Sequence, residues 1–64
     1  MIGTIVTGYD GTRWYNHVTG SDVIANFRAT AVEAEMKGRA MAKQRRVDHV
    51  VLDKEGSVVS HTRY

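Results

Sequence analysis

Short runs of β-branched and aromatic residues alternate with turn signals over the first 28 residues of the chain. Residues 2–7 and 13–18 flank the sequence GYDG at residues 8–11, and this arrangement predicts a hairpin of two strands. A second turn signal at residues 19–22 precedes residues 23–27, where Val, Ile and Phe favour a third strand over a helix. The chain is therefore expected to begin with three strands.

The pattern then changes to one typical of a helix from residue 31 to about residue 45. Thr30 and Glu33 have the spacing of a capping box, in which the threonine hydroxyl accepts from a free backbone amide at the helix start. Small residues recur at helical spacing, so this stripe is expected to face the sheet, and Gly38 at its centre allows a close approach. The stripe consists of Ala31, Ala34, Gly38, Met41 and Ala42.

Residues 47–52 and 57–63 flank the sequence DKEG at residues 53–56, which predicts a second hairpin whose turn is closed by Gly56 in the left-handed region. The predicted order is β-β-β-α-β-β. This order indicates one α+β domain over residues 1–64, built as a small antiparallel sheet, or as two hairpins joined by the helix, with the helix on one face.

Several segments together resemble a short bacterial family, domain of unknown function family 2188. They are FRATAVEA at residues 27–34, GRAMAK at 38–43, VV at 50–51, GSVV at 56–59 and TRY at 62–64. The resemblance covers about residues 13–64 and includes an early strand with a tryptophan, here Trp14. It implies a capped helix followed by a closing hairpin, and it implies no catalytic residues.

Length and composition favour a marginally stable domain. A chain of 64 residues without cysteine cannot add a disulfide to its small core, and domains of this size often gain stability by associating with themselves. The lack of cysteine favours the cytoplasm, and no signal peptide or membrane-spanning run is expected. The net charge of +2 comes from residues 29–46, where five Lys and Arg residues outweigh two Glu residues.

Candidate chemistry is sparse. A bulged turn would set His49 opposite His61, where two imidazoles could share a metal, but zinc sites use three or four protein ligands and Asp48 would point to the other face. We therefore interpret the histidines as a surface pair and expect no metal. Ser57 and Ser60 lack a nucleophile-elbow pattern. The chain is expected to have no catalytic residues, no cofactor and no small-molecule substrate.

Trp14 and Tyr15 should lie on opposite faces of one strand, with Trp14 as the core anchor and Tyr15 at the rim. Val32, Met36 and Ala40 form a second apolar row on the helix, bordered by Arg39 and Lys43. This row is either a set of scattered exposed residues or a partner-binding surface of a non-enzymatic module, homodimeric or bound to another protein.

A nucleic-acid-binding module is the alternative function. Basic residues cluster in the second half of the helix and just after it, where they could contact phosphates while an exposed tyrosine stacks on a base. The residues concerned are Lys37, Arg39, Lys43, Arg45, Arg46 and Tyr15.

Overall fold

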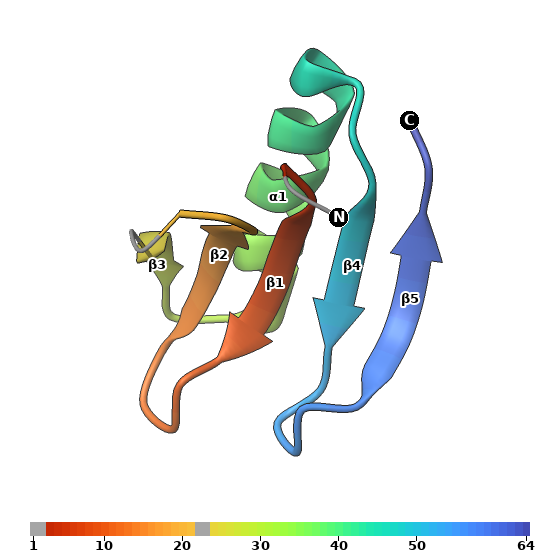
Figure 1. Ribbon diagram of the computed structural model, residues 1–64. Coiled ribbons are helices and arrows are strands. Elements are labelled where there is room, and N and C mark those ends of the chain that lie inside the picture. Colours follow the sequence, from red (N-terminus) through yellow and green to blue (C-terminus); the bar gives the residue numbers. More distant parts are fainter. Residues whose placement is uncertain (1–2, 22–23) are drawn as a thin grey trace.

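The computed structural model describes residues 3–21 and 24–64. Its elements are β1 (Ile5–Tyr9), β2 (Trp14–Val18), β3 (Ile24–Arg28), α1 (Ala31–Arg45), β4 (His49–Leu52) and β5 (Val58–Thr62). The predicted order is confirmed, and the chain has an α+β fold in which α1 packs on a five-stranded sheet (Figure 1). Ile2 and Val23, the predicted first residues of two strands, and Asp22 in the second turn signal lie outside the described residues.

The strand order across the sheet is β3-β2-β1-β4-β5. Three neighbouring pairs are antiparallel, but β1 and β4 run parallel, with Ile5 beside His49 and Thr7 beside Val51. The sheet is therefore mixed and not wholly antiparallel. The reason is that α1 carries the chain back to the end of the sheet where β1 starts, and a crossover of this kind joins parallel strands.

The β1–β2 turn and the β4–β5 turn are held in the same way by an aspartate and a glycine. Asp10 Oδ1 accepts hydrogen bonds from the backbone amides of Thr12 and Arg13, at 2.8 and 2.7 Å. Asp53 Oδ1 accepts from the amides of residues 55 and 57, each at 2.9 Å. Gly56 has φ of 87°, as the sequence predicts, because only glycine adopts this conformation without steric cost.

Helix α1 begins and ends at the predicted residues. Thr30 Oγ1 accepts from the Glu33 amide at 3.2 Å, which confirms the cap. The return half of the capping box differs, because the Thr30 hydroxyl donates to Glu33 Oε1 at 3.0 Å instead of the carboxylate accepting from the Thr30 amide. The helix ends at Arg46, a non-glycine residue in the left-handed region with φ of 58°, whose backbone N–H donates to the Ala42 carbonyl oxygen.

The core lies between α1 and one face of the sheet. Ala34, Gly38 and Ala42 are buried on the helix, as predicted, and Ile5 and Val51 are buried beneath them. The small helix residues bring the helix backbone close to the strands. Trp14 is not the core anchor that its size suggested. It is half-buried and its ring contacts that of Tyr9, with the centroids 4.9 Å apart.

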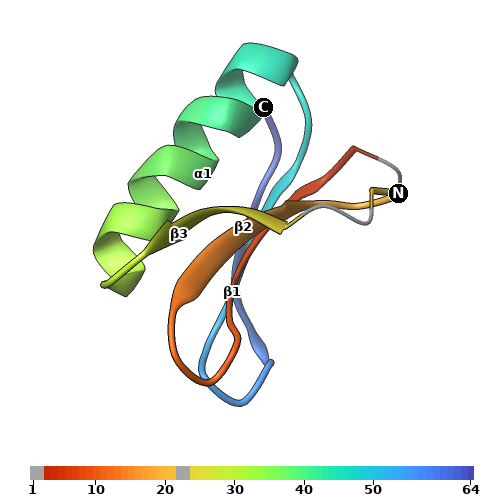
Figure 2. The same cartoon turned by 90° about the vertical axis from the view of Figure 1, so that its left-hand side faces the viewer.

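The opposite face of the sheet has no covering layer among the described residues. Figure 1 looks onto this uncovered face, and Figure 2 shows α1 on the other side of the sheet only. β5 extends beyond the helix and is exposed along its whole length. Two surfaces are therefore available for contact with other molecules, the outward side of α1 and the uncovered face of the sheet.

Candidate functional site

The outward side of α1 carries the predicted partner-binding row. Val32 is 63% exposed and Met36 is 62% exposed, and Ala40 is exposed as well. These residues lie one turn apart, opposite the buried stripe of Ala34, Gly38 and Ala42. Arg39 and Lys43 are also exposed on this side. The five residues predicted as one partner-binding set thus lie on one continuous face, which we call the outer face of α1.

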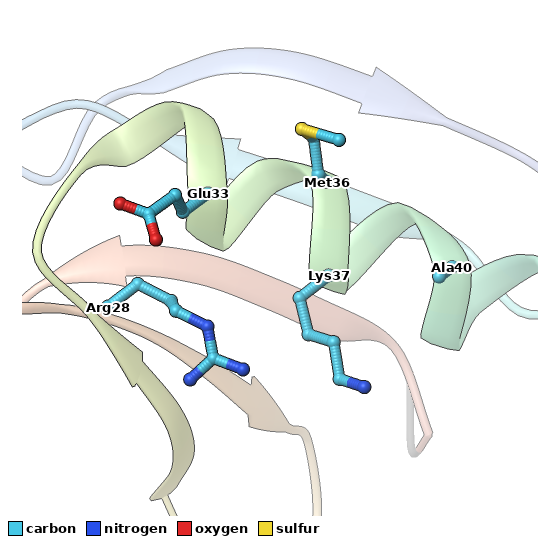
Figure 3. A pocket seen from close by; sticks show the side chains of 5 residues that line it. All are labelled: Arg28, Glu33, Met36, Lys37 and Ala40. Carbon is cyan, nitrogen blue, oxygen red and sulfur yellow. The ribbon is translucent and has the colours of Figure 1, made fainter.

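An open hollow of about 360 Å³ lies beside this face, between the end of β3 and the helix. Its lining residues are Arg28, Glu33, Met36, Lys37 and Ala40. Figure 3 shows Arg28 reaching from β3 beneath the helix, on the same side as the Lys37 side chain, while Met36 leaves the helix on the other side. Two cations and one carboxylate therefore border the apolar row. Arg28 was not recognised from the sequence, because only the packing of β3 against α1 brings it there.

The predicted nucleic-acid-binding residues do not form one surface. Lys37, Arg39, Lys43, Arg45 and Arg46 are exposed on and after α1, and none forms an ion pair with a carboxylate in the part of the chain that the structure describes. Tyr15 lies on the uncovered face of the sheet, since its neighbour Asn16 points to the helix and donates to the Ala34 carbonyl oxygen. The sheet thus separates Tyr15 from the basic residues.

The expected pairing of His49 with His61 is wrong. His49 lies opposite Thr62, and His61 lies opposite Val50, because a bulge near Leu52 shifts the register of the closing hairpin. The two imidazoles are on opposite faces of the sheet and cannot share a metal. His49 is buried at 4% exposure, so it is not a surface residue either.

His61 instead contacts an acidic side chain on the uncovered face. Its Nε2 lies 2.8 Å from Asp48 Oδ2, and the Arg63 Nε atom is 3.9 Å from the same oxygen. Ser60 lies on the other face of the strand, opposite Val51, so no serine hydroxyl completes this pair as a nucleophile. Among residues 3–21 and 24–64, no group of three His, Cys, Asp or Glu side chains could hold a metal ion.

A buried polar network that the sequence did not reveal lies beneath Gly38. The Thr7 hydroxyl donates to Asn16 Oδ1 at 2.6 Å, so Thr7 Oγ1 is left to accept from His49 Nε2 at 2.8 Å. Asn16 Nδ2 donates to the Ala34 carbonyl oxygen at 3.0 Å. Thr7 and Asn16 are at most 1% exposed. A threonine and a histidine at hydrogen-bond distance could act as nucleophile and base, but no substrate can reach these buried atoms.

The protonation of His49 follows from this position. Burial lowers the pKa of His49 below its ordinary value, because the charged imidazolium loses its hydration. The positive charge of Arg39 lowers this pKa further, and the negative charge of Glu35 opposes both effects. His49 is therefore a neutral donor to Thr7. The network is part of the buried interior of the fold.

No protein-family model, curated protein or solved structure matches this chain. The resemblance to domain of unknown function family 2188 stays a prediction. Within the described residues, no helix has the length and apolar character needed to cross a membrane.

Proposed function

We propose that this protein is a small, non-enzymatic interaction module of the cytoplasm, and that the outer face of α1 is its contact surface. The occupant of this face is a second copy of the chain or a helix of another protein. The exposed side chains of Val32 and Met36 are the observation that carries the proposal. Large apolar side chains that recur on one exposed helix face contribute a favourable free energy only when another molecule covers them.

The charges around the row support a helical occupant. Glu33 and Glu35 lie in the first half of α1, whereas Lys37, Arg39 and Lys43 follow in the second half. A helix that is acidic in its first half and basic in its second half, as α1 is, would place its acidic half beside these cations if it ran antiparallel to α1. Opposite charges at the rim of an apolar contact favour this orientation over the parallel one.

Sedimentation equilibrium over a range of concentrations, with and without a candidate partner, tests the proposal. We expect Met36→Glu to weaken the association, because the buried methionine contact is replaced by a carboxylate that loses its hydration. Thr12→Glu adds the same charge at an exposed position in the turn between β1 and β2, away from α1, and should leave the association unchanged. Equal association of wild type and Met36→Glu would exclude the outer face of α1.

Nucleic-acid binding is a second candidate, supported by the five exposed cations without a carboxylate partner in the described part of the chain. Phosphate contacts release counterions, so an affinity that depends on about four such contacts falls steeply as the salt concentration rises. The test is a salt series with random single-stranded and duplex DNA. Binding that persists after Lys43 and Arg45 are both replaced by Gln would exclude this surface.

A further inference from the structure

Polar side chains take an unusually large share of the helix-covered face of the sheet. Among the described residues of the three central strands, the buried side chains on this face are the polar Thr7, Asn16 and His49 and the apolar Ile5 and Val51. Tyr9, Trp14 and Val18 are half-buried on the same face. In antiparallel sheets with one wet face, apolar residues normally face the core and polar residues face water. Here polar groups occupy much of the helix-covered face.

The uncovered face is the more apolar one. Strand register places Val6 beside Val50, and the bulge places Val58 and Val59 opposite Leu52. The apolar side chains on this face are Val6, Tyr15, Phe27, Val50, Leu52, Val58 and Val59. They occur on all five strands, with His17 beside Val6 and His61 beside Val50 in the same face. Figure 1 shows this side of the sheet face-on.

Two aromatic rings of this face are held in place by neighbouring residues. Gly8 lies beneath the Tyr15 ring, where an added Cβ atom would meet the tyrosine Cζ and hydroxyl oxygen at 2.9 and 2.7 Å. The Arg13 guanidinium lies 3.9 Å above the centroid of the Phe27 ring. Both rings are thus fixed against the sheet. A five-stranded face with fixed aromatic side chains suits a second sheet better than a narrow peptide.

We infer that a second copy of this chain covers the uncovered face, so that two sheets pack against each other and α1 lies on the outside of each copy. The charged groups of this face, Arg13, Asp48 and Arg63, lie just outside the strand ends, and Asp48 contacts both His61 and Arg63. Within the described strands this face carries His17 and His61 but no Asp, Glu, Lys or Arg, so packing the face on itself brings no such like charges together at its centre. A nucleic acid would need more cations than this face has.

The area suffices for a weak dimer. Five strands about 4.8 Å apart, with about 3.3 Å per residue, give a face of roughly 400 Å² in projection. Side chains make the accessible area of this face larger than its projection. Two copies together therefore bury on the order of 1,000 Å², which is in the lower range for specific interfaces. The inference goes beyond the proposed function, because it concerns the side of the sheet that α1 does not touch and leaves the outer face of α1 free.

A matched pair of lysine variants tests the inference by sedimentation equilibrium. Val59 lies on the uncovered face and is 61% exposed, whereas its exposed neighbour Ser60 lies on the other face of β5, so both substitutions add the same charge on one strand. We expect Val59→Lys to weaken self-association by about 100-fold, because a lysine charge would be buried against apolar groups. Ser60→Lys should leave it unchanged.

A second measurement needs no substitution. In a mixture of isotope-labelled and unlabelled chains, intermolecular NOEs should connect the methyl groups of Val50, Leu52 and Val59 to the partner copy. The inference is wrong if the wild type is a monomer at millimolar concentration, or if these NOEs arise from Val32 and Met36. It is also wrong if single-stranded nucleic acid, and not a second copy, shifts the Tyr15 and Phe27 resonances. Dimerisation lost in Met36→Glu but kept in Val59→Lys would support the outer face of α1 instead.

Discussion

Replacing Gly38 by alanine should destabilise the protein, although the same change stabilises most helices. A Cβ atom at this position would lie 2.5 Å from Asn16 Oδ1, 2.6 Å from Thr7 Oγ1 and 2.7 Å from His49 Nε2. All three are closer than a carbon atom can approach without displacement. The three side chains are short and hydrogen-bonded to one another, so none can move without breaking the network.

The expected magnitude combines three contributions. Alanine in place of a mid-helix glycine gains about 1 kcal/mol through helix propensity. Overpacking a filled interior costs about 1–3 kcal/mol, and a buried polar atom left without its partner costs about 1–3 kcal/mol. The net expectation is a loss of about 3 kcal/mol. A domain of this length has a total stability of roughly 3–10 kcal/mol, so much of the chain could be unfolded at 37 °C.

Urea unfolding at pH 7, followed by circular dichroism, measures this loss. Ala40→Gly is the control, because Ala40 lies on the exposed side of the same helix and should lose only the propensity difference of about 1 kcal/mol. A Gly38→Ala variant as stable as the wild type, or more stable, would show that the helix does not lie directly on the polar network.

Three further changes probe the helix ends and the buried histidine. Thr30→Ala should lower the free energy of unfolding by about 1 kcal/mol in a urea melt, and an unchanged midpoint would argue against the cap. Arg46→Gly should raise the melting temperature, because glycine adopts the left-handed conformation that costs arginine about 1 kcal/mol, and a lower melting temperature would show that the arginine side chain has a stabilising contact. Burial lowers the pKa of His49 in the folded chain. Below pH 6.5 the His49 imidazole therefore binds a proton more readily in the unfolded chain than in the folded chain. Stability should therefore fall as the pH drops below this value, by at most about 1.4 kcal/mol per pH unit. The dependence should be smaller in His49→Gln, whose amide can still donate to Thr7, and equal slopes in both proteins would refute this assignment.

The sequence predicted the helix better than the sheet because the signals of the helix are local. Thr30 at the cap and the small residues at 34, 38 and 42 depend only on near neighbours, and both ends of α1 agree with the prediction. The pairing of β1 with β4 depends on how α1 crosses the sheet, which no local pattern encodes. The register of His61 depends on a bulge near Leu52, and the sequence of the turn is compatible with more than one register.

In the candidate site, too, the features set by local sequence were predictable and those set by distant contacts were not. The exposure of Val32 and Met36 followed from helical periodicity, since they lie opposite the small residues. The burial of Thr7, Asn16 and His49 did not, because polar residues that alternate in a strand predict a face in water. Their hydrogen bonds become visible only when Gly38 is placed above them. Trp14 was expected in the core because aromatic residues on a half-buried sheet usually serve packing, but it is half-buried and packs against Tyr9, a contact that no local pattern encodes.

The parallel pairing of β1 with β4 has a consequence for how the chain is assembled. Each hairpin and α1 can form from residues close in sequence, on the microsecond timescale of local structure. β1 pairs with residues 49–51 only after almost all of the chain is available. When β1, β2, β3 and α1 form first, one edge of β1 therefore has no strand to pair with until β4 docks. An unpaired edge of this kind can recruit strands from other chains, so the folding chain passes through an aggregation-sensitive stage that ends when β4 pairs with β1.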